Sequence, residues 1–208
     1  MNKVPGYLID NCFNVSNESE HDSLSAFSSR IKFVPDHSSE EFVVGTMDGW
    51  IFHDMYDEYA FDIDGGAWAA YQEIRQDEEI MTSTDCMIYI DEVIIRPEFR
   101  GHGLGLRSIQ QAIITFKRLF KNSELCLRVC LTSCPLVKRD GDKSENFNKL
   151  LSYWRKTGMD LLGDNILCGD VDMMKVFVDL DKRPNFEFTA DEMTQMKLDD
   201  QWRHDIDL

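Results

Sequence analysis

The run from Arg100 to Gly105, R-G-H-G-L-G, constrains the fold of this chain most. It lies between an apolar, strand-like segment that ends at Ile95 and a helix-like segment that begins near Leu104. Glycines allow a tight turn with positive φ and a close approach of the backbone to a ligand. The free N–H groups and the dipole at a helix N-terminus favour an anion. The run therefore predicts a strand–loop–helix unit that binds a pyrophosphate.

The segment after the glycines supports this prediction, because its apolar residues recur every three to four positions, as in an amphipathic helix. They are Leu106, Ile109, Ile113, Phe116 and Phe120. The alternative is a plain tight turn between a strand and a helix. The number of glycines argues against that alternative, since one glycine normally suffices for a turn.

The glycine spacing matches neither the dinucleotide-binding pattern G-x-G-x-x-G nor the Walker A pattern. Instead, it resembles the R/Q-x-x-G-x-G/A acetyl-CoA loop of the GNAT superfamily of N-acetyltransferases. The preceding residues 90–101, I-D-E-V-I-I-R-P-E-F-R-G, are similar to the strand and P-E-[YF]-R-G passage of that family. The resemblance extends from Met87 to Gln110. It implies an α/β (α+β) fold with a mixed central sheet flanked by helices, acetyl-CoA as co-substrate, and no metal.

The same resemblance implies roles for individual residues. Glu92, in the strand before the loop, becomes the candidate general base. A structural alternative for Glu92 is a salt-bridged or solvent-facing strand residue. Asp91 is its neighbour, and side chains alternate along a strand, so only one of the two faces the substrate unless a bulge intervenes. The residues implied to bind acetyl-CoA are Val93, Ile94 and Ile95, through their backbone, and Arg100, Gly101, His102, Gly103, Leu104 and Gly105.

Members of the family commonly protonate the leaving thiolate with a tyrosine that precedes an x-x-x-G motif. Here the corresponding stretch is 153–159, Y-W-R-K-T-G-M, which places Trp154 at the usual tyrosine position and Tyr153 one residue earlier. Tryptophan donates one N–H but is no proton acid at neutral pH. Tyr153 is therefore the candidate acid through a shifted register. The alternatives are protonation by solvent and a packing role for both rings.

The sequence predicts one domain over residues 1–208, with a core of about 41–180 and a C-terminal extension at 181–208. We expect a helix around 22–30, a hairpin formed by 41–45 and 49–53, and an inserted helix near 64–79. Farther on, we expect strands at 126–131, 159–162 and 173–180, a helix over 144–156 that Gly158 ends, and a helix-like tail from Thr189.

The formal net charge is −16. An acidic chain argues against direct binding of nucleic acid and favours a cationic partner, although solubility alone is an equal explanation. Six dispersed cysteines without C-x-x-C spacing indicate reduced thiols. We also expect a cytoplasmic protein without a membrane segment, and a possible homodimer.

The sequence thus predicts an acyltransferase that moves an acetyl group from acetyl-CoA to a primary amine by direct attack. The alternative is a non-catalytic protein of the same fold that uses its acidic surface to bind a basic partner. A toxin that acts on aminoacyl-tRNA is a third possibility, which the acidic charge disfavours.

Overall fold

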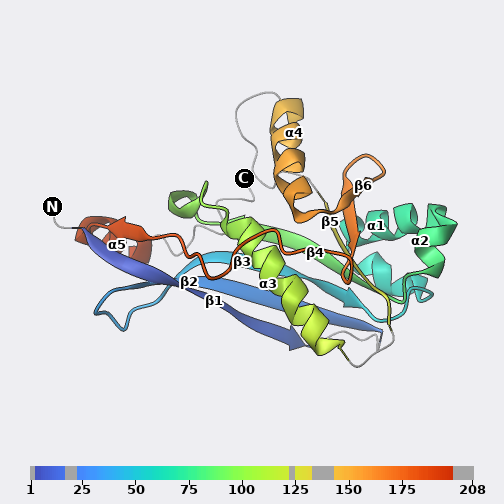
Figure 1. Cartoon of the computed structure of the whole chain (residues 1–208), viewed down its shortest axis with the longest axis horizontal. Coiled ribbons are helices and arrows are strands. Elements are labelled where there is room, and N and C mark those ends of the chain that lie inside the picture. The colour runs from blue at the N-terminus through green and yellow to red at the C-terminus, as the bar shows by residue number, and fades with distance from the viewer. Residues whose placement is uncertain (1–2, 17–22, 122–124, 133–142, 199–208) are drawn as a thin grey trace.

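A computed structural model describes residues 3–16, 23–121, 125–132 and 143–198. Its centre is one mixed sheet of eight strands in the order β6-β7-β5-β4-β3-β2-β1-β8 (Figure 1). All neighbouring strands run antiparallel except β4 and β5, which run parallel. The strands are β1 (Val4–Ser16), β2 (Leu24–Pro35), β3 (Phe42–Phe52), β4 (Cys86–Ile95), β5 (Leu127–Thr132), β6 (Asp160–Leu162), β7 (Ile166–Asp170) and β8 (Phe186–Phe188).

Five α-helices accompany the sheet in the described part of the chain: α1 (Gly65–Gln76), α2 (Glu78–Thr82), α3 (Leu104–Leu119), α4 (Lys143–Trp154) and α5 (Ala190–Leu198). Short 3-10 helices are η1 (Glu58–Ile63), η2 (Pro97–Phe99) and η3 (Arg155–Thr157). Figure 1 shows α3 crossing one face of the sheet, with α1 and α2 gathered at its far end. The predicted α/β fold, a mixed sheet flanked by helices, is confirmed.

The two faces of the sheet bury different apolar clusters. On the α3 face, Phe27, Ile88 and Ile109 belong to one cluster. On the α1 face, Phe52, Tyr71 and other residues form a second cluster, in which the rings of Phe52, Phe61 and Tyr71 stack. Alternation along β3 and β4 supplies both clusters, since successive side chains point to opposite faces.

From β4 onward, the order of elements follows the sequence prediction. β4, the glycine loop, α3, β5, α4, β6 and β7 occur in the order that the resemblance implies. Gly158 follows η3 with a left-handed φ of 82° and so terminates this helical segment. The inserted helix is α1, and a second short helix, α2, follows it. The helix predicted from about Ser144 is α4, which begins at Lys143.

The predictions for the N-terminal part were wrong in two places. Within the predicted helix, residues 24–30 belong to β2 instead, and residue 22 lies outside the described residues. Buried polar residues such as Ser25 and Ser29 obscure the alternation that would have indicated a strand. The predicted hairpin over 41–53 is the single strand β3. Its glycines permit close packing instead of turning the chain. A Cβ at Gly49 would lie 2.2 Å from the backbone oxygen of Tyr89.

The predicted strand at 173–180 is also wrong, because this segment runs beside α3 outside the sheet (Figure 1). Side chains of α3 bind its backbone. Arg107 donates to the carbonyl of Leu180, Gln110 accepts from the N–H of Phe177, and Lys117 donates to the carbonyl of Met174. The strand that follows β6 in the sheet is instead β7, which covers residues 166–170 and pairs with β6.

The described part of the C-terminal extension contributes to the sheet and its core. β8 pairs with the first residues of β1, and Phe186 and Phe188 pack with Phe33 and Phe99. The predicted tail helix is α5 within the described residues, and Met196 is buried in the same apolar cluster. Trp202, which the tail prediction also used, lies outside the described residues.

The adjacent glycines at the start of α1 give a matched test of packing. A Cβ at Gly66 would lie 2.0 Å from the hydroxyl oxygen of Tyr89, whereas a Cβ at Gly65 would meet open space. We expect Gly66→Ala to lower the free energy of unfolding by about 1–3 kcal/mol through overpacking. Gly65→Ala is expected to leave it unchanged or raise it by up to about 1 kcal/mol. Urea unfolding of both variants measures the difference, and equal stabilities would contradict the packing at Gly66.

Candidate active site at the end of β4

The candidate site begins where β4 and β5 separate. The two strands pair from Cys86 opposite Leu127 to Ile90 opposite Leu131. β4 then continues along β3 as far as Ile95, whereas β5 ends at Thr132. Residues 91–95 of β4 therefore have β3 on one edge and, within the described residues, no strand on the other. This opening contains the predicted Glu92, Val93, Ile94 and Ile95.

A β-bulge at this point decides which way the two acidic residues face. Asp48 pairs with Glu92, and the next residue, Gly49, pairs with Ile90, so Asp91 is the extra residue. Directly opposite residues in an antiparallel pair share a face, and a bulge sets two residues against one. Asp91 and Glu92 therefore both lie on the face of Asp48, which is the α1 face.

The acidic character of this face affects the pKa of Asp91. Burial raises the pKa of the Asp91 carboxyl, and the nearby charges of Asp64 and Asp48 raise it further. Asp64 is fixed at this position because its side chain caps α1, accepting a hydrogen bond of 2.7 Å from the N–H of Ala67. Three elements thus direct carboxylates towards the opening: β3, β4 and the start of α1.

A hydrogen bond joins β4 and β5 at the point where they part. The hydroxyl oxygens of Tyr89 and Thr132 lie 2.9 Å apart. Tyr89 is buried under the start of α1, and this burial raises the pKa of its phenol well above the ordinary value. The bond holds both strands at the base of the opening and fixes the Tyr89 ring beside Asp91.

The backbone of the predicted phosphate loop is left-handed at two of its glycines. Gly101 and Gly103 have φ values of 82° and 76°, in the left-handed region that favours glycine. Gly103 is the N-cap of α3 and has no side chain to cap the helix. The N–H groups of the first turn of α3 therefore need other hydrogen-bond acceptors. Arg100 points back to β4, where its Nε donates to the carbonyl of Ile95 at 2.8 Å.

Gly105 has a different role from the other two glycines. It lies inside α3, and a Cβ there would meet Trp154 at 3.0 Å and the hydroxyl of Tyr153 at 3.2 Å. The absence of a side chain therefore lets the end of α4 pack onto the first turn of α3. His102 is exposed, and its ring lies 4.8 Å from the ring of Phe186.

Tyr153 contacts the N-terminus of α3 directly. Its hydroxyl oxygen accepts a hydrogen bond of 3.1 Å from the N–H of Leu106. Burial raises the pKa of the Tyr153 phenol, and hydrogen bonds from the N–H groups of Leu106 and Gly105 partly offset that rise. Because the oxygen accepts here, the phenolic proton stays available for donation to another group. Trp154 is buried in the α3-face cluster, where a packing role accounts for it.

The strand register also distinguishes the backbone groups of residues 93–95. The N–H of Arg96 donates to the carbonyl of Val44 on β3. Successive residues of a strand direct their backbone groups to opposite edges. Val93 and Ile95 therefore direct theirs into the opening, whereas Ile94 directs its own towards β3. The carbonyl of Ile95 already accepts from Arg100.

Sequence reasoning missed the residues that come from other elements, namely Asp48, Asp64, Tyr89 and Thr132. Only Asp64 carried a local signal, as an aspartate before a helix pattern, which is typical of an N-cap. The other three enter the site through strand pairing.

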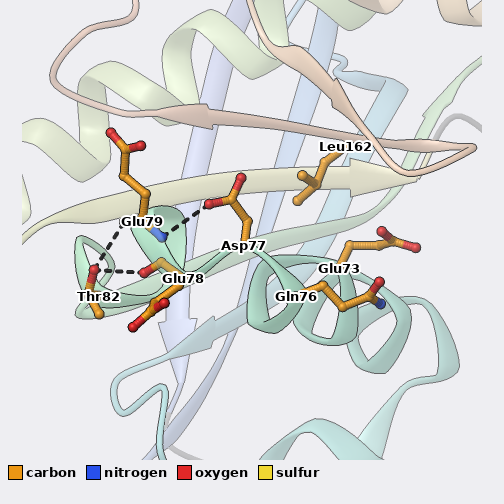
Figure 2. A pocket seen from close by; sticks show the side chains of 7 residues that line it. All are labelled: Glu73, Gln76, Asp77, Glu78, Glu79, Thr82 and Leu162. Atoms are coloured by element: carbon orange, nitrogen blue, oxygen red, sulfur yellow. Dashed lines mark hydrogen bonds between the residues drawn. The ribbon is translucent and has the colours of Figure 1, made fainter.

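A cavity of about 740 Å³ lies elsewhere, between α1, α2 and β6. Figure 2 shows its acidic lining, which includes Glu73, Asp77, Glu78 and Glu79, together with Leu162 from β6. Asp77 serves α2 there, accepting from the N–H groups of Glu79 and Ile80. None of the predicted site residues lines this cavity.

Two further properties concern the described residues only. Among them, no group of three or more His, Cys, Asp or Glu side chains is arranged to hold a metal ion. Within the same ranges, no helix is long and apolar enough to cross a membrane.

Comparison with solved structures gives low-identity likenesses. The KacTA–DNA complex is 9% identical with a TM-score of 0.41, over 74% of this chain and 71% of that one. AtaTR bound with acetyl-CoA is 9% identical with a TM-score of 0.41, over 78% and 94%. A tyrosine variant of the AtaT toxin, bound to the C-terminus of the antitoxin AtaR and acetyl-CoA, is 10% identical with a TM-score of 0.38, over 79% and 95%. No protein-family model and no curated protein sequence matches the chain. Sequence identities and TM-scores this low support no conclusion about the chemistry of this chain.

The expected partners are nevertheless corrected. We predicted an amine acceptor, possibly cationic, and no direct nucleic acid. The KacTA structure is a complex with DNA, and the AtaT variant is bound to an antitoxin chain. The physical error was to exclude nucleic acid from net charge alone. A charge summed over the whole chain fixes neither a local surface nor a contact made through a partner.

Proposed function

We propose that this chain is an acyltransferase that uses acetyl-CoA and acetylates a primary amine. The observation that carries the proposal is the opening between β4 and β5 beside the N-terminus of α3. The opening exposes one edge of β4, and the helix N-terminus has left-handed glycines and no side-chain cap. These features fit a thioester with an anionic pyrophosphate.

In this proposal, the loop from Arg100 to Gly105 binds the pyrophosphate, and the backbone groups of Val93 and Ile95 pair with the pantetheine arm. The N–H groups of the first turn of α3 supply positive potential to the phosphates. Arg100 contributes by tying the loop to β4, as its hydrogen bond to the carbonyl of Ile95 suggests. Acetyl-CoA supplies the activated acetyl group when bound.

The acid–base roles fall to Glu92 and Tyr153. An alkylammonium has a pKa near 10.4, so the attacking amine must first lose a proton. Glu92 accepts this proton, directly or through water, and the amine nitrogen attacks the thioester carbonyl. The C–N bond forms as the C–S bond breaks, and Tyr153 donates its phenolic proton to the departing thiolate. No covalent enzyme intermediate is required.

One experiment separates this activity from mere binding. The protein is incubated with acetyl-CoA labelled in its acetyl group and with a cell extract, and the products are separated by size and identified by mass spectrometry. We expect label on an amine nitrogen in one fraction. Binding of acetyl-CoA without any transfer would favour the non-catalytic alternative, and absence of binding would overturn the proposal.

The two adjacent aromatic residues of α4 make the acid role testable. We expect Tyr153→Phe to lower turnover by roughly 10-fold or more, because the proton donor is lost, while acetyl-CoA affinity changes little. Trp154→Phe is expected to act through packing and so to lower thermal stability more than turnover. Steady-state kinetics and calorimetry on both variants measure these effects. Normal turnover in Tyr153→Phe would leave protonation of the thiolate to solvent.

A further inference from the structure

Two cysteines face each other across neighbouring strands outside the acyl-transfer site. Cys130 of β5 and Cys168 of β7 are directly opposite in the strand register. Their Sγ atoms lie 2.7 Å apart as free thiols. Opposite residues of an antiparallel pair have Cα atoms about 4.5 or 5.5 Å apart, and both values lie within the range of disulfides. A covalent bond between these sulfurs therefore needs no rearrangement of the backbone.

The two other cysteines whose side chains the structure describes lack this arrangement. Cys86 is buried on the opposite face of the sheet, in the α3-face cluster, and its register partner is Leu127. Cys126 is exposed and precedes β5. Cys130 and Cys168 instead share the α1-face cluster with Tyr71 and Ile166.

The two thiols are shielded from solvent, and this shielding slows their oxidation. Cys130 is fully buried and Cys168 is 5% exposed. Burial raises the pKa of the Cys130 thiol well above the ordinary value, as does its hydrogen bond to Cys168, so the reactive thiolate is scarce. The route to solvent is the edge of the sheet, where β6 has three residues and pairs with β7 alone among the described strands. Opening of this edge exposes Cys168 first.

We propose that Cys130 and Cys168 are a redox modification site, which a hydroperoxide converts into a reversible disulfide between β5 and β7. The Cys168 thiolate attacks the peroxide oxygen, which gives a sulfenic acid and releases water or alcohol. The Cys130 thiolate then attacks the sulfenic sulfur. The S–S bond forms, and the hydroxyl leaves as water with the second thiol proton. Two thiols are oxidised, one peroxide is reduced, and a dithiol reverses the bond. This site does not depend on the acyltransferase activity.

The test treats the full chain with hydrogen peroxide, quenches with catalase, blocks remaining thiols and maps tryptic peptides. We expect peptide 129–138 linked to peptide 157–175, and the link should disappear with dithiothreitol. Because the cysteines are 38 residues apart, the bond restricts the unfolded chain, and Tm should rise by about 5–10 °C. The rate should increase in dilute urea, which favours opening of the β6–β7 edge.

Four cysteine variants identify the bonded pair, because peptide 129–138 also contains Cys134, which lies outside the described residues. The link must persist in Cys134→Ser and in Cys126→Ser, and it must vanish in Cys130→Ala without a change in methionine oxidation. Cys168→Ala confirms the second position. The proposal is overturned if Cys134→Ser abolishes the link, or if the native chain shows only sulfinic acid at these cysteines while Cys126 oxidises normally.

Discussion

Glu92→Gln is expected to lower the turnover number for acetyl transfer by roughly 10²–10⁴-fold while acetyl-CoA affinity stays within about two-fold. The amide keeps the shape of the side chain but cannot accept the proton of the attacking amine. The acidic limb of the pH–rate profile should flatten as well, because that limb reports protonation of the base. Calorimetry with acetyl-CoA and steady-state kinetics with an identified acceptor supply both measurements.

The bulge in β4 supplies the necessary comparison, because Asp91 and Glu92 lie on one face of the sheet. Asp91→Asn removes the neighbouring carboxylate, and we expect a smaller loss of turnover than in Glu92→Gln. Glu78→Gln, on α2 and exposed, is the control for a general loss of negative charge. If Asp91→Asn inactivates the protein and Glu92→Gln does not, Asp91 is the base. Full turnover in both variants would show that neither carboxylate is the base, and that the site promotes acyl transfer only by positioning its substrates.

The sequence was most informative where contiguous residues determine the structure. The strand exit, the 3-10 turn at Pro97, the glycines and the amphipathic α3 follow one another along the chain. Each depends on local chemistry: restricted φ at proline, positive φ at Gly101 and Gly103, and the periodicity of the helix. This part of the fold and the position of the loop could therefore be predicted.

The set of residues that make up the site could not be predicted from the sequence, because it depends on the register between strands. Asp91 and Glu92 share the face of Asp48 only because the pairing of β4 with β3 shifts by one residue at this point. The bulge that causes this shift adjoins Gly49, which the sequence presented as a turn glycine. A Cβ there would also meet the ring of Phe27 at 2.6 Å. Sequence spacing does not distinguish a glycine that packs closely in a strand from one that turns the chain.

The apolar run at 173–180 failed as a strand for a related reason. Val176, Phe177 and Val178 have strand propensity, yet partners from α3 decide their conformation. The buried guanidinium of Arg107 and the amide of Gln110 satisfy backbone groups of this segment that a sheet would otherwise pair. Tertiary contacts thus override local propensity at this position.

Gly103→Val is expected to weaken acetyl-CoA binding by more than roughly 10-fold, because the phosphate loop needs the left-handed backbone at this residue. Gly103 has a φ of 76°, and β-branched residues rarely adopt such values. Space is not the obstacle, since a Cβ at Gly103 would meet no atom within 4 Å. The loss therefore comes from a changed loop conformation, which misdirects the N–H groups that precede α3. Calorimetry with acetyl-CoA measures the affinity.

Gly105→Ala is the matched comparison, because its Cβ would press on Trp154 at 3.0 Å without any strain in φ. We expect this variant to lose stability through the contact between α3 and α4, with acetyl-CoA affinity reduced less than in Gly103→Val. Circular dichroism must show that Gly103→Val keeps its secondary structure, since Gly103 itself belongs to none of the apolar clusters. Unchanged affinity in a folded Gly103→Val variant would remove the loop from the site, and the opening between β4 and β5 would then have to bind the thioester without it.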